Sequence, residues 1–156
     1  MAQIKVYLDN CTYNRPFDDQ SQIRISLESQ AKLYIQRLII NKELYLVYSY
    51  MSLYENSENP NPEHRNSIWD FFHYATDFIG IDKADIIGTR AQAIKKWNIK
   101  SNDAIHLACA IEAGCEYFIT TDDGILRNYR ASDILVYSPV DFISEVTNAY
   151  YRGDSK

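Results

Sequence analysis

Short runs of apolar residues recur along the chain, and the longer stretches between them repeat their apolar positions every three or four residues. The short runs are apolar on both faces, which is typical of strands buried in a parallel sheet. We predict four such strands, over residues 4–8, 44–48, 117–119 and 134–137. Each run is brief, so the sheet is expected to be short.

The periodic stretches predict helices that alternate with the strands. They cover residues 21–41, 49–58, 62–78, 82–97 and 101–113, with a short helix after the turn at 120–124 and a terminal helix over 139–146. This alternation predicts a three-layer α/β/α sandwich with a short central parallel sheet. The length of 156 residues fits one domain, residues 1–156.

Capping residues locate several predicted helix starts. Ser52 and Glu55 have capping-box spacing, which places Glu55 in the first turn of the second helix. Asp82 is expected to cap the fourth helix, and either Ser101 or Asn102 is expected to cap the fifth.

Composition and charge narrow the classes of function. With 46% hydrophobic and 24% charged residues, the chain has the composition of a globular protein. The longest uncharged stretch, 44–54, is too short to span a membrane, and the N-terminus does not resemble a signal peptide, so we expect a cytoplasmic protein. Three cysteines without a CxxC pair fit a reducing compartment. The net charge of -5 argues against coating nucleic acid by bulk electrostatics, so any nucleic-acid role must be local and helped by metal.

Four acidic residues fall at the same edge of the predicted sheet. Asp9 follows the first strand, Glu55 opens the helix after the second, Asp103 opens a later helix, and Asp122 follows the third strand. Ligands of parallel α/β sheets bind at the carboxyl ends of the strands. Carboxylates gathered in one pocket repel one another, and hard divalent cations hold them ionised. The pattern therefore predicts a Mg²⁺ or Mn²⁺ site suited to phosphodiester hydrolysis.

Each of these acids also has a structural interpretation. Asp103 can complement a helix dipole, and Glu55 can be a capping-box partner. Glu58, one helical turn later, is a rival ligand. Asp122 can be a turn residue with Asp123 as the cap of the next helix.

Four segments, in this order, resemble the signature segments of PIN-domain ribonucleases of the VapC-like toxin type. They are residues 6–11 (VYLDNC), 49–55 (SYMSLYE), 102–108 (NDAIHLA) and 117–123 (YFITTDD). The resemblance covers nearly the whole chain and implies a parallel sheet between helices. It also implies Mg²⁺- or Mn²⁺-dependent cleavage of RNA.

Carried over position by position, the resemblance implies four acids that bind the metal and act in catalysis: Asp9, Glu55, Asp103 and Asp122. As auxiliary residues it implies Asn10, Asp123 and a hydroxyl from Thr120 or Thr121. Whether Glu55 or Glu58 is the second acid stays open, as does the number of metal ions. Small members of the family resemble the toxins of toxin-antitoxin pairs, which implies an antitoxin partner. The apolar helices at 25–39 and 68–78 offer surfaces for an antitoxin and for a homodimer.

Two other functions compete with this hypothesis. A phosphatase of the haloacid dehalogenase type also has an aspartate after its first strand, but its second acid would here be Cys11. A non-catalytic PIN-like module that binds RNA or protein would not need to gather four acids. Metal binding distinguishes the two hypotheses, because the nuclease requires a bound metal and the binding module does not.

The remaining polar residues allow a structural interpretation. His106, three residues after Asp103, can share its helix face and approach the site, but we favour its interpretation as a buried packing residue. The candidate contacts to an RNA backbone are equally well explained as solvated helix faces. They are Arg24, Lys32, Arg37, Lys95, Lys96, Lys100, Arg127 and Arg130.

Overall fold

Five parallel strands form the central sheet in the spatial order β3-β2-β1-β4-β5. The computed structural model describes residues 3–152. The strands are β1 (Lys5–Leu8), β2 (Tyr45–Ser49), β3 (Asp77–Ile79), β4 (Tyr117–Ile119) and β5 (Leu135–Tyr137). Since every pairing is parallel, the carboxyl ends of the strands meet at one edge of the sheet.

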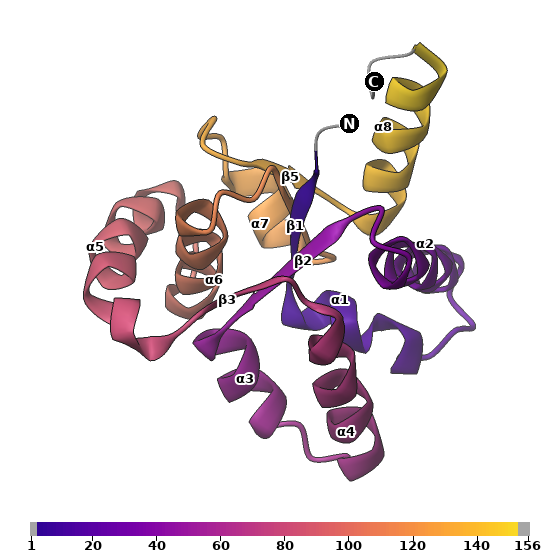
Figure 1. Ribbon diagram of the computed structural model, residues 1–156, viewed down its shortest axis with the longest axis horizontal. Helices are drawn as coiled ribbons and strands as arrows, with labels where there is room; N and C mark the ends of the chain where they lie inside the picture. The colour runs from indigo at the N-terminus through magenta and orange to yellow at the C-terminus, as the bar shows by residue number, and fades with distance from the viewer. Residues whose placement is uncertain (1–2, 153–156) are drawn as a thin grey trace.

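Helices cover both faces of the sheet (Figure 1). They are α1 (Asn10–Asn14), α2 (Ile23–Ile40), α3 (Tyr50–Ser57), α4 (Pro62–Phe71), α5 (Ala84–Ile94), α6 (Ser101–Glu112), α7 (Asp123–Asn128) and α8 (Pro139–Arg152). Single 3-10 turns occupy residues 15–17, 72–74, 81–83 and 95–97. Within residues 3–152, none of the helices has the length and apolarity that crossing a membrane requires.

Alternate residues of the central strands β1, β2 and β4 enter two separate hydrophobic cores. Tyr7, Val47 and Phe118 pack with apolar residues of α5 and α6 on one face. Val6 and Leu46 pack with α2, α4 and α8 on the other. Figure 1 shows α5 and α6 on one side of the sheet and α2 and α8 on the other. The predicted three-layer α/β/α sandwich is therefore confirmed.

The edge strand β3 corrects the prediction of four strands. The helix predicted over 62–78 ends at Phe71, and after a 3-10 turn Ala75 takes extended backbone angles. Phe78, which the periodic pattern assigned to a buried helical stripe, pairs with Tyr48 of β2 and is 41% exposed. The residues of β3, DFI, offer only two apolar positions, which fit the end of a helical stripe as well as a strand.

The helix α3 begins where the sequence predicted, but its capping box differs from the prediction. Ser49 is the N-cap, and its side chain and that of Ser52 bond reciprocally to each other's backbone N–H groups. The capping box therefore lies three residues earlier than Ser52 and Glu55 suggested. Glu55 consequently lies in the second turn of α3.

Two further caps were predicted wrongly. The N-cap of α5 is Lys83, because Asp82 belongs to a preceding 3-10 turn. The N-cap of α6 is Lys100, so Ser101 and Asn102 are already helical. Neither lysine makes a side-chain capping bond.

Candidate active site

The carboxyl edge of the sheet brings two of the predicted acids together with a histidine. Asp9 directly follows β1, Glu55 extends from α3, and His106 extends from α6. One potential ligand atom from each of the three lies within 4.8 Å of the other two. His106 Nε2 is in direct hydrogen-bond contact with Glu55 Oε1 and lies 4.0 Å from Asp9 Oδ1.

Asp9 is the most firmly held of the acids. Its Oδ1 accepts a hydrogen bond from the backbone N–H of Asn10 at 2.8 Å, because Asp9 is the N-cap of α1. Its Oδ2 accepts one from the hydroxyl of Thr120 at 2.8 Å and a longer one from the thiol of Cys11 at 3.4 Å. These bonds offset the loss of hydration of a carboxylate that is 5% exposed.

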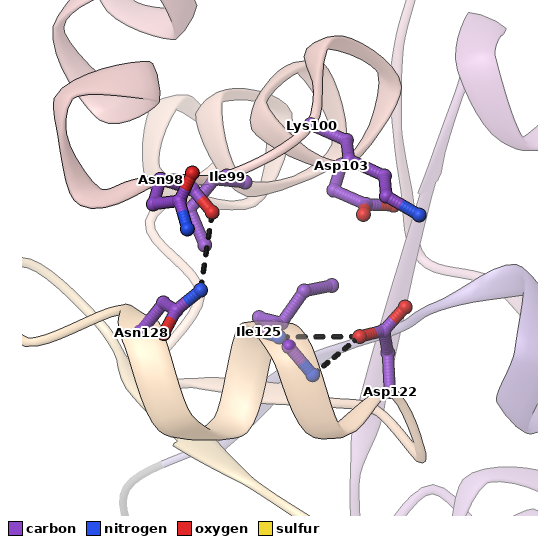
Figure 2. Close-up of a pocket in the computed structure, with 8 residues that line it drawn as sticks. Asn98, Ile99, Lys100, Asp103, Asp122, Ile125 and Asn128 are labelled. Carbon is purple, nitrogen blue, oxygen red and sulfur yellow. Dashed lines mark hydrogen bonds between the residues drawn. The ribbon is translucent and has the colours of Figure 1, made fainter.

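Asp122 is held in a similar way at the start of α7. It is the N-cap, and its Oδ1 accepts hydrogen bonds from the backbone N–H groups of Gly124 and Ile125 at 2.7 and 3.2 Å. The alternative in which Asp123 caps this helix is therefore wrong. Figure 2 shows the side chains of Asp103 and Asp122 on opposite sides of a pocket between α6 and α7.

That pocket has a volume of about 260 Å³. It is lined by Asn98, Ile99, Lys100, Asp103, Asp122, Gly124, Ile125 and Asn128. A hydrogen bond from the Asn128 side chain to the Asn98 carbonyl closes one end of it (Figure 2). Lys100 is the basic residue in the lining, so the pocket combines two carboxylates with one ammonium group.

The pKa of Asp103 is raised by its burial and by the charges of the other three acids. Burial raises the pKa of its carboxyl, and the negative charges of Asp9 and Asp122 raise it further, to about 6. Glu55 adds to the shift and His106 opposes it. The four acids come from four segments and their charges act on one another, while their roles in a metal site stay a prediction.

Glu55, and not Glu58, faces this cluster. Both line a second cavity of about 570 Å³, which Asn10 and Asn102 also border. Only Glu55 also reaches Asp9 and His106 among the described residues. The geometry favours Glu55 as the second acid.

His106 does more than pack. Its side chain is fully buried, as expected of a packing residue, yet both ring nitrogens are hydrogen-bonded to polar side chains, those of Tyr7 and Glu55. Burial lowers the pKa of His106, but the hydrogen bond that its ring donates to Glu55 and the charge of Asp9 outweigh burial and raise it. Both sequence interpretations of His106 therefore hold in part, since it is buried and also reaches the acidic residues, but the spacing on α6 does not reveal its partners Tyr7 and Glu55.

The auxiliary residues divide into two groups. The hydroxyl of Thr120 donates a hydrogen bond to Asp9. Thr121 instead bonds through its backbone: its N–H donates to the Cys11 sulfur, and its carbonyl accepts from Arg24. Asp123 forms a bidentate ion pair with Arg24, which lowers the pKa of its carboxyl. Arg24 is thus occupied by an internal partner. The auxiliary role that the resemblance implied for Asp123 stays a prediction.

Replacing Thr120 by Val is expected to destabilise the protein by about 1–3 kcal/mol. The change keeps the shape of the buried side chain but removes the donor to Asp9 Oδ2 and the acceptor for the Asp122 backbone N–H, which is 3.0 Å away. Urea unfolding of the metal-free protein measures the effect. Thr120→Ser is the control, because it keeps the hydroxyl. Equal stability of the Val and Ser variants would contradict this account of Asp9.

Cys11 and Tyr7 are site residues that the sequence analysis did not single out. Burial, aided by the charge of Asp9, raises the pKa of the Cys11 thiol to about 12, so the group is a neutral donor to Asp9. Tyr7 lies between Val6 and Leu8 in β1, where a phenol is expected simply to pack. Its hydrogen-bond partners come from α3 and α6, and local spacing cannot reveal them.

The fold and the site define a parallel α/β domain with an acidic centre at the carboxyl edge of its sheet. The model of the PIN domain family matches residues 7–131. The chain therefore belongs to the PIN domain family. No curated protein matches it significantly in sequence.

Solved structures have the same fold. FitAcB from Neisseria gonorrhoeae superposes with a TM-score of 0.55 at 18% identity, over 86% of this chain and 97% of that one. VapBC2 from Rickettsia felis, bound to a DNA fragment from their promoter, gives a TM-score of 0.54 at 15% identity, over 85% of this chain and 97% of that one. At these identities, the likeness establishes the fold.

Proposed function

We propose that this protein is a Mg²⁺- or Mn²⁺-dependent endoribonuclease that acts as the toxin of a toxin-antitoxin pair. One observation on a PIN domain carries the proposal: Asp9 and Glu55 meet at His106, Asp103 and Asp122 line one pocket, and the charges of the other three acids act on Asp103. Their roles as metal ligands and catalytic residues are part of it.

The donor set fits a hard divalent cation. All four acids offer carboxylate oxygens, the ligands that Mg²⁺ and Mn²⁺ prefer. Their mutual repulsion, visible in the raised pKa of Asp103, is what a cation would offset. When bound, the metal would polarise the phosphodiester and acidify a water molecule.

The protein itself would orient the reacting groups. Thr120 and the Asn10 backbone hold Asp9, while the N-terminus of α7 holds Asp122. Lys100, which lines the pocket with Asp103, would contact a phosphate of the RNA. The second cavity, with the amides of Asn10 and Asn102, would accommodate the strand on the other side of the centre.

An antitoxin protein is the partner we propose. Arg or Lys of a short antitoxin segment would insert among the four acids and replace the charge of the metal. Large apolar side chains remain exposed on α2, including Ile23, Leu27 and Leu33, and these offer a surface for flanking antitoxin residues or for a homodimer.

The direct test is cleavage of an end-labelled RNA by the purified protein. We expect cutting with Mg²⁺ or Mn²⁺, none with EDTA, and none by Asp9→Asn, whereas Asp133→Asn, which changes an exposed loop residue, should remain active. Expression of the wild type without an antitoxin should slow growth, and Asp9→Asn should not. Metal binding without cleavage of any RNA would contradict the nuclease. Failure to bind metal would favour the non-catalytic binding module.

A further inference from the structure

A chain of buried hydrogen bonds leads from the start of α3 to the acidic centre. Tyr7 Oη, in the middle of the sheet, contacts Ser49 Oγ at 2.7 Å, Ser52 Oγ at 3.0 Å and His106 Nδ1 at 2.6 Å. The other ring nitrogen of His106 contacts Glu55. Four of these five side chains are at most 4% exposed, and Glu55 is the outermost.

The directions of these hydrogen bonds follow from counting donors and acceptors. Ser49 Oγ already accepts from two backbone N–H groups, those of Met51 and Ser52, because it caps α3. Its own hydrogen must therefore be donated, and Tyr7 Oη is the nearest acceptor. Tyr7 Oη therefore accepts one hydrogen bond, from the hydroxyl of Ser49.

The remaining bonds allow two proton arrangements at His106. Either Ser52 donates to Tyr7 and Tyr7 donates to Nδ1, or Nδ1–H donates to Tyr7 and Tyr7 donates to Ser52. In both, Nε2 must carry a hydrogen, since it faces the carboxylate of Glu55, with Asp9 Oδ1 4.0 Å away. A bare Nε2 would place its lone pair against these acceptors.

The position of the Glu55 carboxylate depends on the His106 donor more than the positions of Asp9 and Asp122 depend on any single hydrogen bond. Asp9 and Asp122 are short side chains, each held by at least two hydrogen bonds. Glu55 has one more rotatable bond, and His106 is its hydrogen-bond partner among the described side chains. Asp103 and His106 lie three residues apart on α6, so one helix face presents both an acid of the centre and the donor to another acid.

We infer that His106 is a positioning residue that holds Glu55 through Nε2–H, fixed in turn by Tyr7, Ser49 and Ser52, and is not itself a metal ligand. This inference rests on the proposed function where it concerns the metal. The hydrogen-bond chain can be tested without metal.

Two spectroscopic measurements on the wild type test it. In the metal-free protein, ¹⁵N NMR of the imidazole side chains should show His106 with a protonated Nε2. In the Mn²⁺-loaded protein, pulsed electron paramagnetic resonance should show no directly bound ¹⁴N. A bare Nε2, or strong ¹⁴N coupling that disappears in His106→Gln, would overturn the inference.

Variants provide a second test through Mn²⁺ affinity. His106→Leu removes the donor and should weaken Mn²⁺ binding about 10- to 100-fold, as loss of a partner that orients a ligand does. His106→Gln places an amide N–H at a similar reach and should restore affinity to within about threefold of wild type. His73→Gln, at an exposed histidine, is the matched control.

The outcomes separate this inference from the proposed function. If the wild type binds no Mn²⁺ and cleaves no RNA, the proposed function fails, while the metal-free NMR result still decides the hydrogen-bond chain. If the wild type binds Mn²⁺ and His106→Leu binds it equally well, the positioning role fails. Should His106→Leu not fold, the two wild-type measurements decide.

Discussion

Asp103→Asn is expected to reduce metal-dependent cleavage by at least about 100-fold and to stabilise the metal-free protein at neutral pH. The substitution removes a hard oxygen ligand from the proposed centre. It also removes a negative charge that burial and the charges of Asp9 and Asp122 disfavour, as the raised pKa shows. If Asp103 had only a structural role, its replacement would not combine a loss of cleavage with a gain in stability.

The gain in stability depends on pH, and its sign follows from proton linkage. The pKa of Asp103 rises from 3.8 to about 6 on folding, so the native state binds more protons than the unfolded chain between these values. The wild type therefore loses stability as pH rises through this window, and the Asn variant does not. We expect the variant to be more stable by about 1 kcal/mol at pH 7, discounted for partial exposure, and to have no advantage below about pH 4.

Urea unfolding at pH 4 and pH 7, paired with the RNA cleavage assay, checks this prediction. Asp133→Asn is the control for loss of one exposed negative charge. Full activity of Asp103→Asn, or lower stability than wild type at pH 7, would remove Asp103 from the acidic centre.

The convergence of the acids could be predicted because parallel topology puts strand ends at a common edge. Asp9 and Asp122 follow β1 and β4, which are neighbours in the sheet. Their relation needs only the strand assignments and the alternation of strands with helices. Apolar runs as strong as 4–8 and 117–119 make those assignments secure.

The contacts that orient the acids could not be predicted from spacing. His106 and Glu55 are 51 residues apart, and neither segment carries a sign of the other. Tyr7 occupies an apolar position of β1, and its ring fits the hydrophobic pattern of the strand. That pattern gives no information about the partner of its hydroxyl. Such pairings depend on how α3 and α6 pack, which is a tertiary property.

The sequence also could not show which basic residues are available to contact RNA. Arg24 was a candidate RNA contact, but it binds the Asp123 carboxylate at 2.7 and 3.0 Å and the carbonyl of Thr121. Lys32 is buried, with its amine on Gln36. A basic residue in a sequence carries the same charge whether it faces solvent, RNA or an acid of its own chain, so only the fold distinguishes these cases.

Mn²⁺ is expected to stabilise the folded protein strongly at pH 7.5 and much less at pH 5. At 100 times the dissociation constant, binding to the native state alone adds about 2.7 kcal/mol. For a chain of 156 residues this corresponds to a rise in Tm of roughly 5–10 °C. Below the pKa of about 6, Asp103 holds a proton that the metal must displace, so apparent affinity falls.

Thermal melts with Mn²⁺ or EDTA at the two pH values, at matched ionic strength, measure this effect. Asp103→Asn should lose most of the Mn²⁺-dependent rise and, lacking the titrating carboxyl, most of its dependence on pH. Asp133→Asn should behave as the wild type. A rise in Tm that is equal at pH 5 and pH 7.5 would mean that Mn²⁺ binds away from Asp103. A Tm that does not respond to millimolar Mn²⁺ at either pH would mean that the gathered carboxylates are held by protein hydrogen bonds alone.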